Sequence, residues 1–344
     1  MLKLKIPPEM IDYHKAYFKK YKIKDRLSVE IITDKFIAKK KIVKENLSVE
    51  YSDKIRELSN TLRDNLETLA IGTYNELRTL NSEIEKRYEA FDKGDDLIIK
   101  EVIKEQFGYE NIFVKGHKEV DENCNNQEEK MARNWNPYLW AKLLKVRTCA
   151  YCNRQYVTYL PKINKSNNGD EQKGGIRPDI DHYWSQHLYP HFSMSLYNWV
   201  PSCKICNSSL KRDREIVIYN KTLYEMNFAN EFKFRAEGIV DGDIRIKITK
   251  EKIDKSAEDL LELFRMEDQY QAHNNIAKDF IRKKIIYNKD MINAIRSNSC
   301  EYIAKESIDL LPLIVGFSRE ENIDKEALGK LKCDLAKQMN LYKI

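Results

Sequence analysis

The sequence contains no long hydrophobic run. No stretch of its 344 residues approaches the roughly 18–20 uninterrupted apolar residues that a membrane-spanning helix needs. The N-terminal segment passes from Met1–Ile6 through Pro7-Pro8 into a charged stretch, without the apolar core of a secretory signal. We therefore expect a protein without a membrane segment, located in the cytoplasm.

An extreme composition is also absent. Apolar residues make up 42% of the chain and charged residues 33%, which is typical of a well-charged globular protein and excludes a wholly disordered one. The chain is long enough to bury a core and to form one large domain or two to three small ones. We find no internal repeat of about 20–50 residues, so a solenoid is not expected.

The chain carries only a mild excess of positive charge, with a net charge of +6. The charge is uneven, because residues 1–60 hold fifteen Lys and Arg against nine Asp and Glu, including the run Lys39-Lys40-Lys41. A basic arm of this kind suits the phosphates of nucleic acid. An ordinary solvated surface explains the same charge equally well, so this observation does not decide between the two.

The cysteine count argues against a disulfide framework, because seven is an odd number and no secretory signal accompanies it. Four of the cysteines form two C-x-x-C pairs, with fifty residues (153–202) between them: Cys149-Ala-Tyr-Cys152 and Cys203-Lys-Ile-Cys206. A C-x-x-C turn directs two thiolates to one side, at a separation that fits Zn–S bonds of about 2.3 Å. The two pairs therefore predict a zinc site with four cysteine ligands.

This zinc is expected to be structural, since four protein ligands leave no position for a reacting water. It would join two segments that are distant in sequence and would contribute to folding directly. The alternative is that one pair is a redox dithiol or an unpaired coincidence. The remaining three cysteines are expected to be ordinary thiols: Cys124, Cys300 and Cys333.

Residues 1–145 are expected to form a mainly helical N-terminal region. Apolar residues recur every three or four positions over residues 51–91, which predicts amphipathic helices with a break near Gly72. A polar loop over residues 116–130 is predicted to precede a short helix over residues 137–145.

The helical pattern stops in residues 146–220. Residues 154–160 alternate and are rich in Tyr and Val, which predicts a strand, and the polar segment 164–175 is expected to be a loop. The residues with candidate chemistry lie on both sides of this strand and loop.

Residues 221–344 form the third predicted region, with a small β element followed by helices. Two strand-like runs, 231–235 and 244–248, surround a turn at 241–243. Helices are expected over residues 256–298 and 325–339. Together the three regions predict an α+β fold that is mainly α-helical.

The residues between the cysteine pairs combine groups that suit phosphodiester hydrolysis. His182 is a candidate general base, because an imidazole is neutral near pH 7. Asp181 supplies a carboxylate and Asn207 an amide oxygen, which are ligands that a hard ion such as Mg²⁺ prefers.

Several neighbouring residues have open roles. Asp179 could replace or assist Asp181, but an alternating strand would direct both side chains to one face, so their proximity does not decide between them. His187 and His191 are four residues apart, but Pro190 disfavours a helix there, so they are expected in a loop or at a phosphate. Three cations flank the predicted ligand helix and could contact phosphates or simply be solvated: Lys204, Lys211 and Arg212.

The order Asp181-His182, then Asn198, then Cys203-x-x-Cys206-Asn207 resembles the HNH, or ββα-metal, endonuclease superfamily. The resemblance covers about residues 147–212. It implies a β-hairpin bearing Asp181 and His182, a loop, and a helix bearing Asn207.

The resemblance also implies a role for each matched residue. His182 would be the general base, and Asp181 and Asn207 would be the ligands of a catalytic Mg²⁺ or Mn²⁺. Asn198 would orient the loop that carries the base. The expected architecture is a central zinc-stapled ββα-metal (HNH) core at 146–220 between helical N- and C-terminal regions.

More narrowly, residues 179–211 resemble HNH proteins of bacterial anti-phage systems such as Septu and some retrons. This implies a defence effector that cuts nucleic acid, with DNA the expected substrate. It also implies an SMC-like or AAA ATPase partner, or a homo-oligomer. Many of those proteins have a Pro-Lys-Ser-Lys-like stretch where this chain has Trp184-Ser-Gln-His187.

The competing prediction is a non-catalytic zinc module that binds nucleic acid or a partner. The complete Asp-His-Asn-Asn set favours the nuclease, because a subunit without turnover need not keep all four residues.

Overall fold

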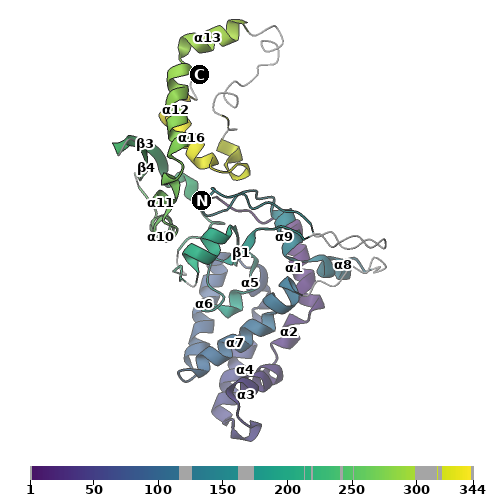
Figure 1. Ribbon diagram of the computed structural model, residues 1–344. Coiled ribbons are helices and arrows are strands. Elements are labelled where there is room, and N and C mark those ends of the chain that lie inside the picture. Colours follow the sequence, from purple (N-terminus) through teal and green to yellow (C-terminus); the bar gives the residue numbers. More distant parts are fainter. Residues whose placement is uncertain are drawn as a thin grey trace.

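The computed structural model describes residues 2–115, 126–161, 174–212, 214–217, 220–240, 243–250, 252–298, 316 and 320–341 (Figure 1). The described fold is mainly helical, with two small sheets of two strands each, so the predicted α+β class is confirmed. The division into three regions stays a prediction. Within the described part of the chain, no helix has the length and apolarity to cross a membrane.

The N-terminal region is built from short helices. They are α1 (Pro8–Lys20), α2 (Ile23–Arg26), α3 (Val29–Lys40), α4 (Val49–Asp64), α5 (Leu66–Ile71), α6 (Tyr74–Glu89), α7 (Asp95–Phe107), the π-helix η2 (Tyr109–Val114), α8 (Gln127–Asn134) and α9 (Pro137–Leu144). The predicted break at Gly72 is confirmed. A Cβ at Gly72 would lie 2.5 Å from the carbonyl oxygen of Thr68, so only glycine fits. Next, Thr73 and Glu76 form a capping box that starts α6.

An antiparallel, hairpin-like element lies at the centre of the chain. Strand β1 (Asp179–His182) pairs with β2 (Trp199–Ser202), so that His182 lies opposite Trp199. The connecting loop contains the 3₁₀ turns η3 (Pro190–Phe192) and η4 (Leu196–Asn198), and the π-helix η5 (Ile205–Lys211) follows β2.

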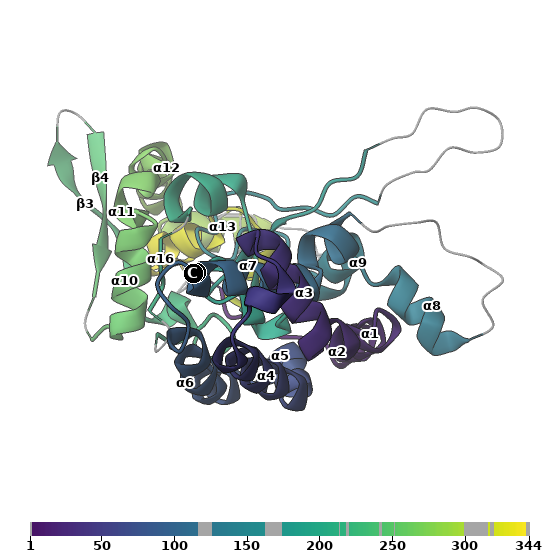
Figure 2. The ribbon, with the colours of Figure 1, turned by 90° about the horizontal axis from the view of Figure 1, so that it is seen from below.

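The predicted strand over residues 154–160 is wrong. Only isolated bridges form, Thr148 with Tyr156 and Leu160 with Ile176. Tyr156, Leu160 and Ile176 are exposed, so the alternating side chains have no sheet face to cover and no ladder develops. The stretch up to residue 161 and the stretch that begins at residue 174 extend side by side away from the rest of the molecule (Figure 2).

The C-terminal region begins with the predicted β element and continues with helices. Its elements are β3 (Lys233–Val240), β4 (Asp243–Thr249), α10 (Lys255–Leu263), α11 (Met266–Gln271), α12 (Asn274–Ile286), α13 (Lys289–Asn298), the 3₁₀ helix η7 (Glu320–Lys325) and α16 (Gly329–Gln338). The last helix starts later than expected, because Leu328 adopts the left-handed conformation with φ 62°. Of the predicted turn at 241–243, residues 241–242 lie outside the described residues, and Asp243 begins β4.

Side chains of two helices close both edges of the β3–β4 sheet. Gln338 of α16 accepts a hydrogen bond from the Ala236 N–H at 2.9 Å and donates one to the Ala236 carbonyl at 2.9 Å. Gln271 of α11 makes the same pair of bonds with Ile246 on the other strand. Each amide therefore takes the place of a neighbouring strand's peptide group.

The elements follow one another along the molecule (Figure 1). Helices α2 to α7 gather at one end, β1 and α9 lie in the middle, and β3, β4 and helices α10 to α13 and α16 form the other end. Trp199 of β2 is fully buried where the N-terminal helices meet the central hairpin. Its ring stacks on Phe113 at 4.7 Å and meets His14 of α1 edge-on at 5.4 Å. The central hairpin thus shares a core with the N-terminal helices.

The basic run of the N-terminal region is partly neutralised within the fold. Lys39 lies 2.9 and 2.8 Å from Glu101 and Glu105, and Lys40 pairs with Asp95. These two cations are therefore engaged by α7, which weakens the interpretation of this run as a phosphate-binding arm.

Two histidines lie in the core. The Nδ1 of His14 accepts a hydrogen bond from the Trp135 indole at 3.0 Å, and its Nε2 therefore donates to the carbonyl of Met194 at 2.7 Å. His191 contacts the Asn81 side chain at 3.0 Å. Burial lowers the pKa of each imidazole from 6.5 to about 3.

These two histidines predict a loss of stability in mild acid. Both stay neutral in the fold, whereas the unfolded chain protonates them below about pH 6.5, so stability is complete above that pH and falls as the pH drops toward 3. From about 1.4 kcal/mol per pH unit for each group, we expect the free energy of unfolding to fall by at least about 4 kcal/mol between pH 7 and pH 5. Urea titrations across this range measure it. His191→Gln should reduce the slope and the exposed His187→Gln should not, and a flat profile would contradict the assignment.

Candidate metal centre and adjoining polar site

The four cysteines of the two C-x-x-C pairs come together in the fold. Their sulfur atoms all lie within 4.8 Å of one another and are buried, and the Cys152 and Cys203 sulfurs are 3.9 Å apart. Tetrahedral Zn–S bonds of about 2.3 Å place sulfurs about 3.8 Å apart. The cluster could therefore bind a metal such as zinc, and the predicted set of four cysteines is confirmed as a cluster.

The backbone around the cluster ties it to the central hairpin. The Ala150 N–H donates to the carbonyl of Pro201 in β2 at 3.0 Å, and the second cysteine pair begins where β2 ends. Burial raises the pKa of the Cys149 thiol. A bound cation reverses this effect, because metal coordination requires and stabilises thiolates.

The other cysteines are not part of this cluster. Cys333 is buried in α16, and in the described part of the chain only the four named cysteines gather in this way. Cys124 and Cys300 lie outside the described residues.

Asp181 of β1 is buried beside the cluster and both of its carboxylate oxygens are engaged. Lys211 Nζ donates to Oδ1 at 2.9 Å, and the Tyr151 hydroxyl, from within the first C-x-x-C pair, donates to Oδ2. Burial raises the pKa of Asp181, and the adjacent Lys211 ammonium opposes that rise. This carboxylate is held between η5 and the first cysteine pair.

His182 follows at the end of β1 and is 6% exposed. Its Nε2 lies 2.8 Å from the carbonyl oxygen of Ser193, and the Tyr109 ring meets the imidazole edge-on at 4.5 Å. A carbonyl can only accept, so Nε2 carries the proton and Nδ1 keeps a free lone pair. Burial lowers the pKa of His182 to about 3, which keeps the imidazole neutral at pH 7.

Asn198 holds the loop between the two strands in one conformation. Its Oδ1 accepts from the Trp184 N–H at 2.7 Å, and its Nδ2 donates to the carbonyls of Trp184 and Phe192, both at 3.0 Å. The side chain is fully buried, so these bonds are made away from water. Its amide spans the loop that begins directly after His182.

Asn207 lies on η5, and its Nδ2 donates to Asp179 Oδ2 at 3.4 Å. Among the described residues it makes no hydrogen bond to Asp181. Asp179 and Asp181 alternate along β1 and share one face. Asn207 is therefore adjacent to Asp179, and carboxylate and amide oxygens are the kinds of ligand that hard divalent ions prefer.

The structure separates the remaining candidates. His187 and Lys204 are exposed, whereas His191 is fully buried and is not accessible to a phosphate. Lys211 is 2% exposed, so the expectation of a solvated face is wrong for it. Lys211 comes four residues after Asn207, which is about one turn along the same helix. This spacing was the sequence signal that could have placed the two side chains in one site.

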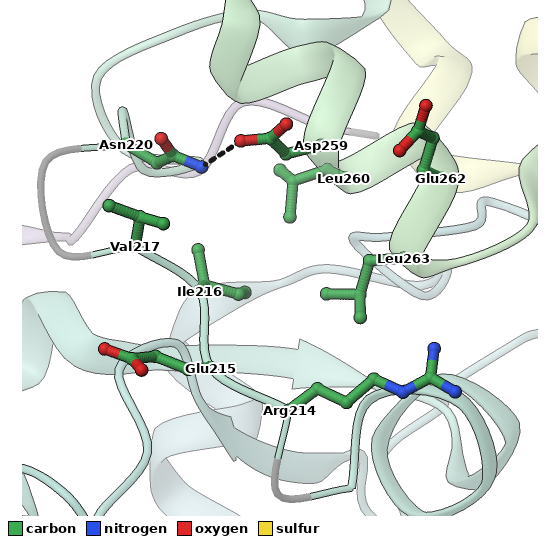
Figure 3. Close-up of a pocket in the computed structure, with 9 residues that line it drawn as sticks. All are labelled: Arg214, Glu215, Ile216, Val217, Asn220, Asp259, Leu260, Glu262 and Leu263. Atoms are coloured by element: carbon green, nitrogen blue, oxygen red, sulfur yellow. Dashed lines mark hydrogen bonds between the residues drawn. The ribbon is translucent and has the colours of Figure 1, made fainter.

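A surface pocket of about 400 Å³ lies farther along the chain (Figure 3). Its walls are the segment 214–217, which follows η5, and helix α10. Asn220 donates to Asp259 at 3.0 Å across one end. None of the four matched polar residues lines this pocket, so it is distinct from the site around Asp181.

The chain matches no family model, no curated protein and no solved structure. What it can do must therefore be argued from its own side chains. These are a four-cysteine cluster next to a buried carboxylate, a neutral imidazole and two amides.

The cluster predicts one tightly bound zinc ion per chain, measured by elemental analysis of the purified protein. Cys206→Ser should remove most of the zinc and destabilise the fold, because structural zinc supplies folding free energy directly. Cys333→Ala is the matched control, since it removes a buried cysteine outside the cluster and should leave the zinc content unchanged. Full zinc content in Cys206→Ser would rule out the four-cysteine site.

Proposed function

We propose that this protein is a metal-dependent HNH-type endonuclease that hydrolyses phosphodiester bonds of nucleic acid, with DNA the expected substrate. The observation that carries the proposal is the arrangement of His182. Its Nε2–H binds a loop carbonyl, its Nδ1 keeps a lone pair, and the buried Asn198 amide fixes the loop that supplies that carbonyl.

The order of elements supports the same proposal. Asp181 and His182 end β1, β1 pairs with β2, and Asn207 lies on the short helix after β2. This is the strand–strand–helix order that the resemblance to the ββα-metal superfamily implies. The cysteine cluster joins this unit to the segment that precedes it.

In the proposed reaction, His182 acts as the general base through Nδ1. The carbonyl of Ser193 accepts the Nε2 proton and fixes the tautomer and the orientation of the ring. A water near Nδ1 would lose its proton to the imidazole as it attacks the phosphorus, and the P–O3′ bond would break. The leaving 3′ oxygen would take a proton from solvent, giving 5′-phosphate and 3′-hydroxyl ends. The positive charge that then forms on the ring is favoured by the Nε2–H···O=C bond.

Asp181 and Asn207 would hold the catalytic divalent ion, and Asp179 is close enough to Asn207 to assist. When bound, such an ion neutralises the phosphate and stabilises the leaving oxygen. Asn198 acts on the base indirectly, because it keeps the loop that binds the imidazole in place.

The proposal predicts that His182→Ala abolishes cleavage and that the protein still folds. Loss of a general base typically costs 10²–10⁴-fold in rate, so a decrease of at least about 100-fold is expected. Supercoiled plasmid and single-stranded DNA would be incubated with wild type or variant in Mg²⁺, Mn²⁺ or EDTA, and nicking followed on gels.

His187→Ala provides the control, since it removes an exposed histidine of the same loop and should leave cleavage unchanged. Zinc content of His182→Ala should match wild type and its thermal unfolding should remain cooperative, because the Trp199 indole still donates to the Ser193 carbonyl at 2.9 Å. Normal cutting by His182→Ala would refute its role as the base.

One observation favours a second candidate, a non-catalytic zinc-stabilised subunit that binds nucleic acid or a partner. Both oxygens of Asp181 already have protein partners, as a purely structural carboxylate would. Metal-dependent nicking that needs His182 separates the two candidates. Binding of DNA without any nicking favours the second.

We further propose, from the family resemblance alone, that the nuclease serves anti-phage defence. It would then be restrained by an SMC-like or AAA ATPase, or by homo-oligomerisation. Co-purification with the product of a neighbouring gene, and the mass of the purified protein in solution, test this.

A further inference from the structure

The buried ion pair between Lys211 and Asp181 has no assigned role in the proposed reaction. The two side chains are 2% and 4% exposed, and the Lys211 ammonium also donates to the His182 carbonyl at 2.6 Å. One cation therefore binds the candidate metal ligand and the backbone of the candidate base.

A second buried Lys–Asp pair in the same protein provides a comparison, because it lies away from Asp181. Lys330 and Asp334 lie four residues apart on α16, 2.6 Å from each other and 6% and 5% exposed. That pair stabilises one helix and the edge of β3, where Asp334 also accepts from the Phe234 N–H. By contrast, Lys211 and Asp181 connect η5 to β1 at the place where the divalent ion would bind.

Charge makes the two cations competitors. A divalent ion on Asp181 would lie within a few ångströms of the Lys211 ammonium, and like charges in a low-dielectric interior repel strongly. The single negative charge of Asp181 balances the ammonium while no ion is bound, and even with the charge of Asp179 added it does not balance the ammonium and a divalent ion together. The Lys211 side chain can move away from the carboxylate, because a lysine ammonium is a point charge on a flexible four-carbon stem.

We propose that Lys211 is the internal counter-ion of Asp181 and competes with the divalent ion for it, so that Lys211 sets the metal affinity of the site. The inference rests on the proposed function, which places the ion on Asp181. Lys211 is thus a positioning residue that holds the Asp181 carboxylate in place while no ion is bound, and metal binding displaces its ammonium from the carboxylate.

The test measures Mn²⁺ binding by calorimetry to the zinc-loaded protein, for wild type, Lys211→Met and Asp181→Asn. Removing the competing charge should tighten Mn²⁺ binding of Lys211→Met by about tenfold or more, and Asp181→Asn should abolish it. Lys211→Arg keeps the charge and should not bind more tightly than wild type. A merely structural lysine predicts the opposite sign, since its loss would loosen the site and weaken binding.

Lys330→Met is the matched control, because it breaks an equally buried Lys–Asp pair away from the site and should leave Mn²⁺ affinity unchanged. Lys211→Gln replaces Lys211→Met if the latter loses zinc or fails to fold. Equal or weaker binding by the folded Lys211 variants, together with Asp181-dependent binding in wild type, overturns this inference and leaves the proposed function standing. No Asp181-dependent Mn²⁺ binding in any variant overturns both.

Discussion

Four sulfur atoms lie within 4.8 Å of one another where the end of β2 meets residues 149–152, and a metal ion bound there would hold these two segments together. Strands β1 and β2 are four residues each, and an isolated two-stranded sheet is at best marginally stable in water. The cysteine cluster joins the end of β2 to residues 149–152, and Tyr151 from that segment reaches Asp181. The position of the carboxylate on β1 thus depends on a segment that precedes β1 in the sequence.

The N-terminal helices provide the second support of the site. They bind the loop after β1 at three separate points: the Met194 carbonyl by His14 of α1, the His191 ring by Asn81 of α6, and the Ser195 hydroxyl by the Leu69 carbonyl of α5. Ser193, which binds the candidate base, lies between these points. The N-terminal helices therefore help to position the loop that binds the His182 imidazole.

Sequence patterns predicted those features that local chemistry decides. The spacing of cysteines indicated the cluster, apolar periodicity indicated the helices, and Gly72 indicated a break that a Cβ contact with Thr68 enforces. The prediction failed at residues 154–160, because strand propensity does not reveal whether a partner strand exists. The sequence also left open whether Lys211 is solvated, because burial depends on which distant segment packs over a side chain.

The two glutamines that close the β3–β4 sheet limit how this protein can meet other molecules. The Phe234 and Ala236 N–H groups on one edge, and those of Ile246 and Ile248 on the other, are all taken by side chains of α16 and α11. An incoming strand finds none of these four N–H groups free, so strand addition at these positions is opposed. A neighbouring copy could pair through these N–H groups only if the side chains from α16 and α11 first moved away from the strand edges.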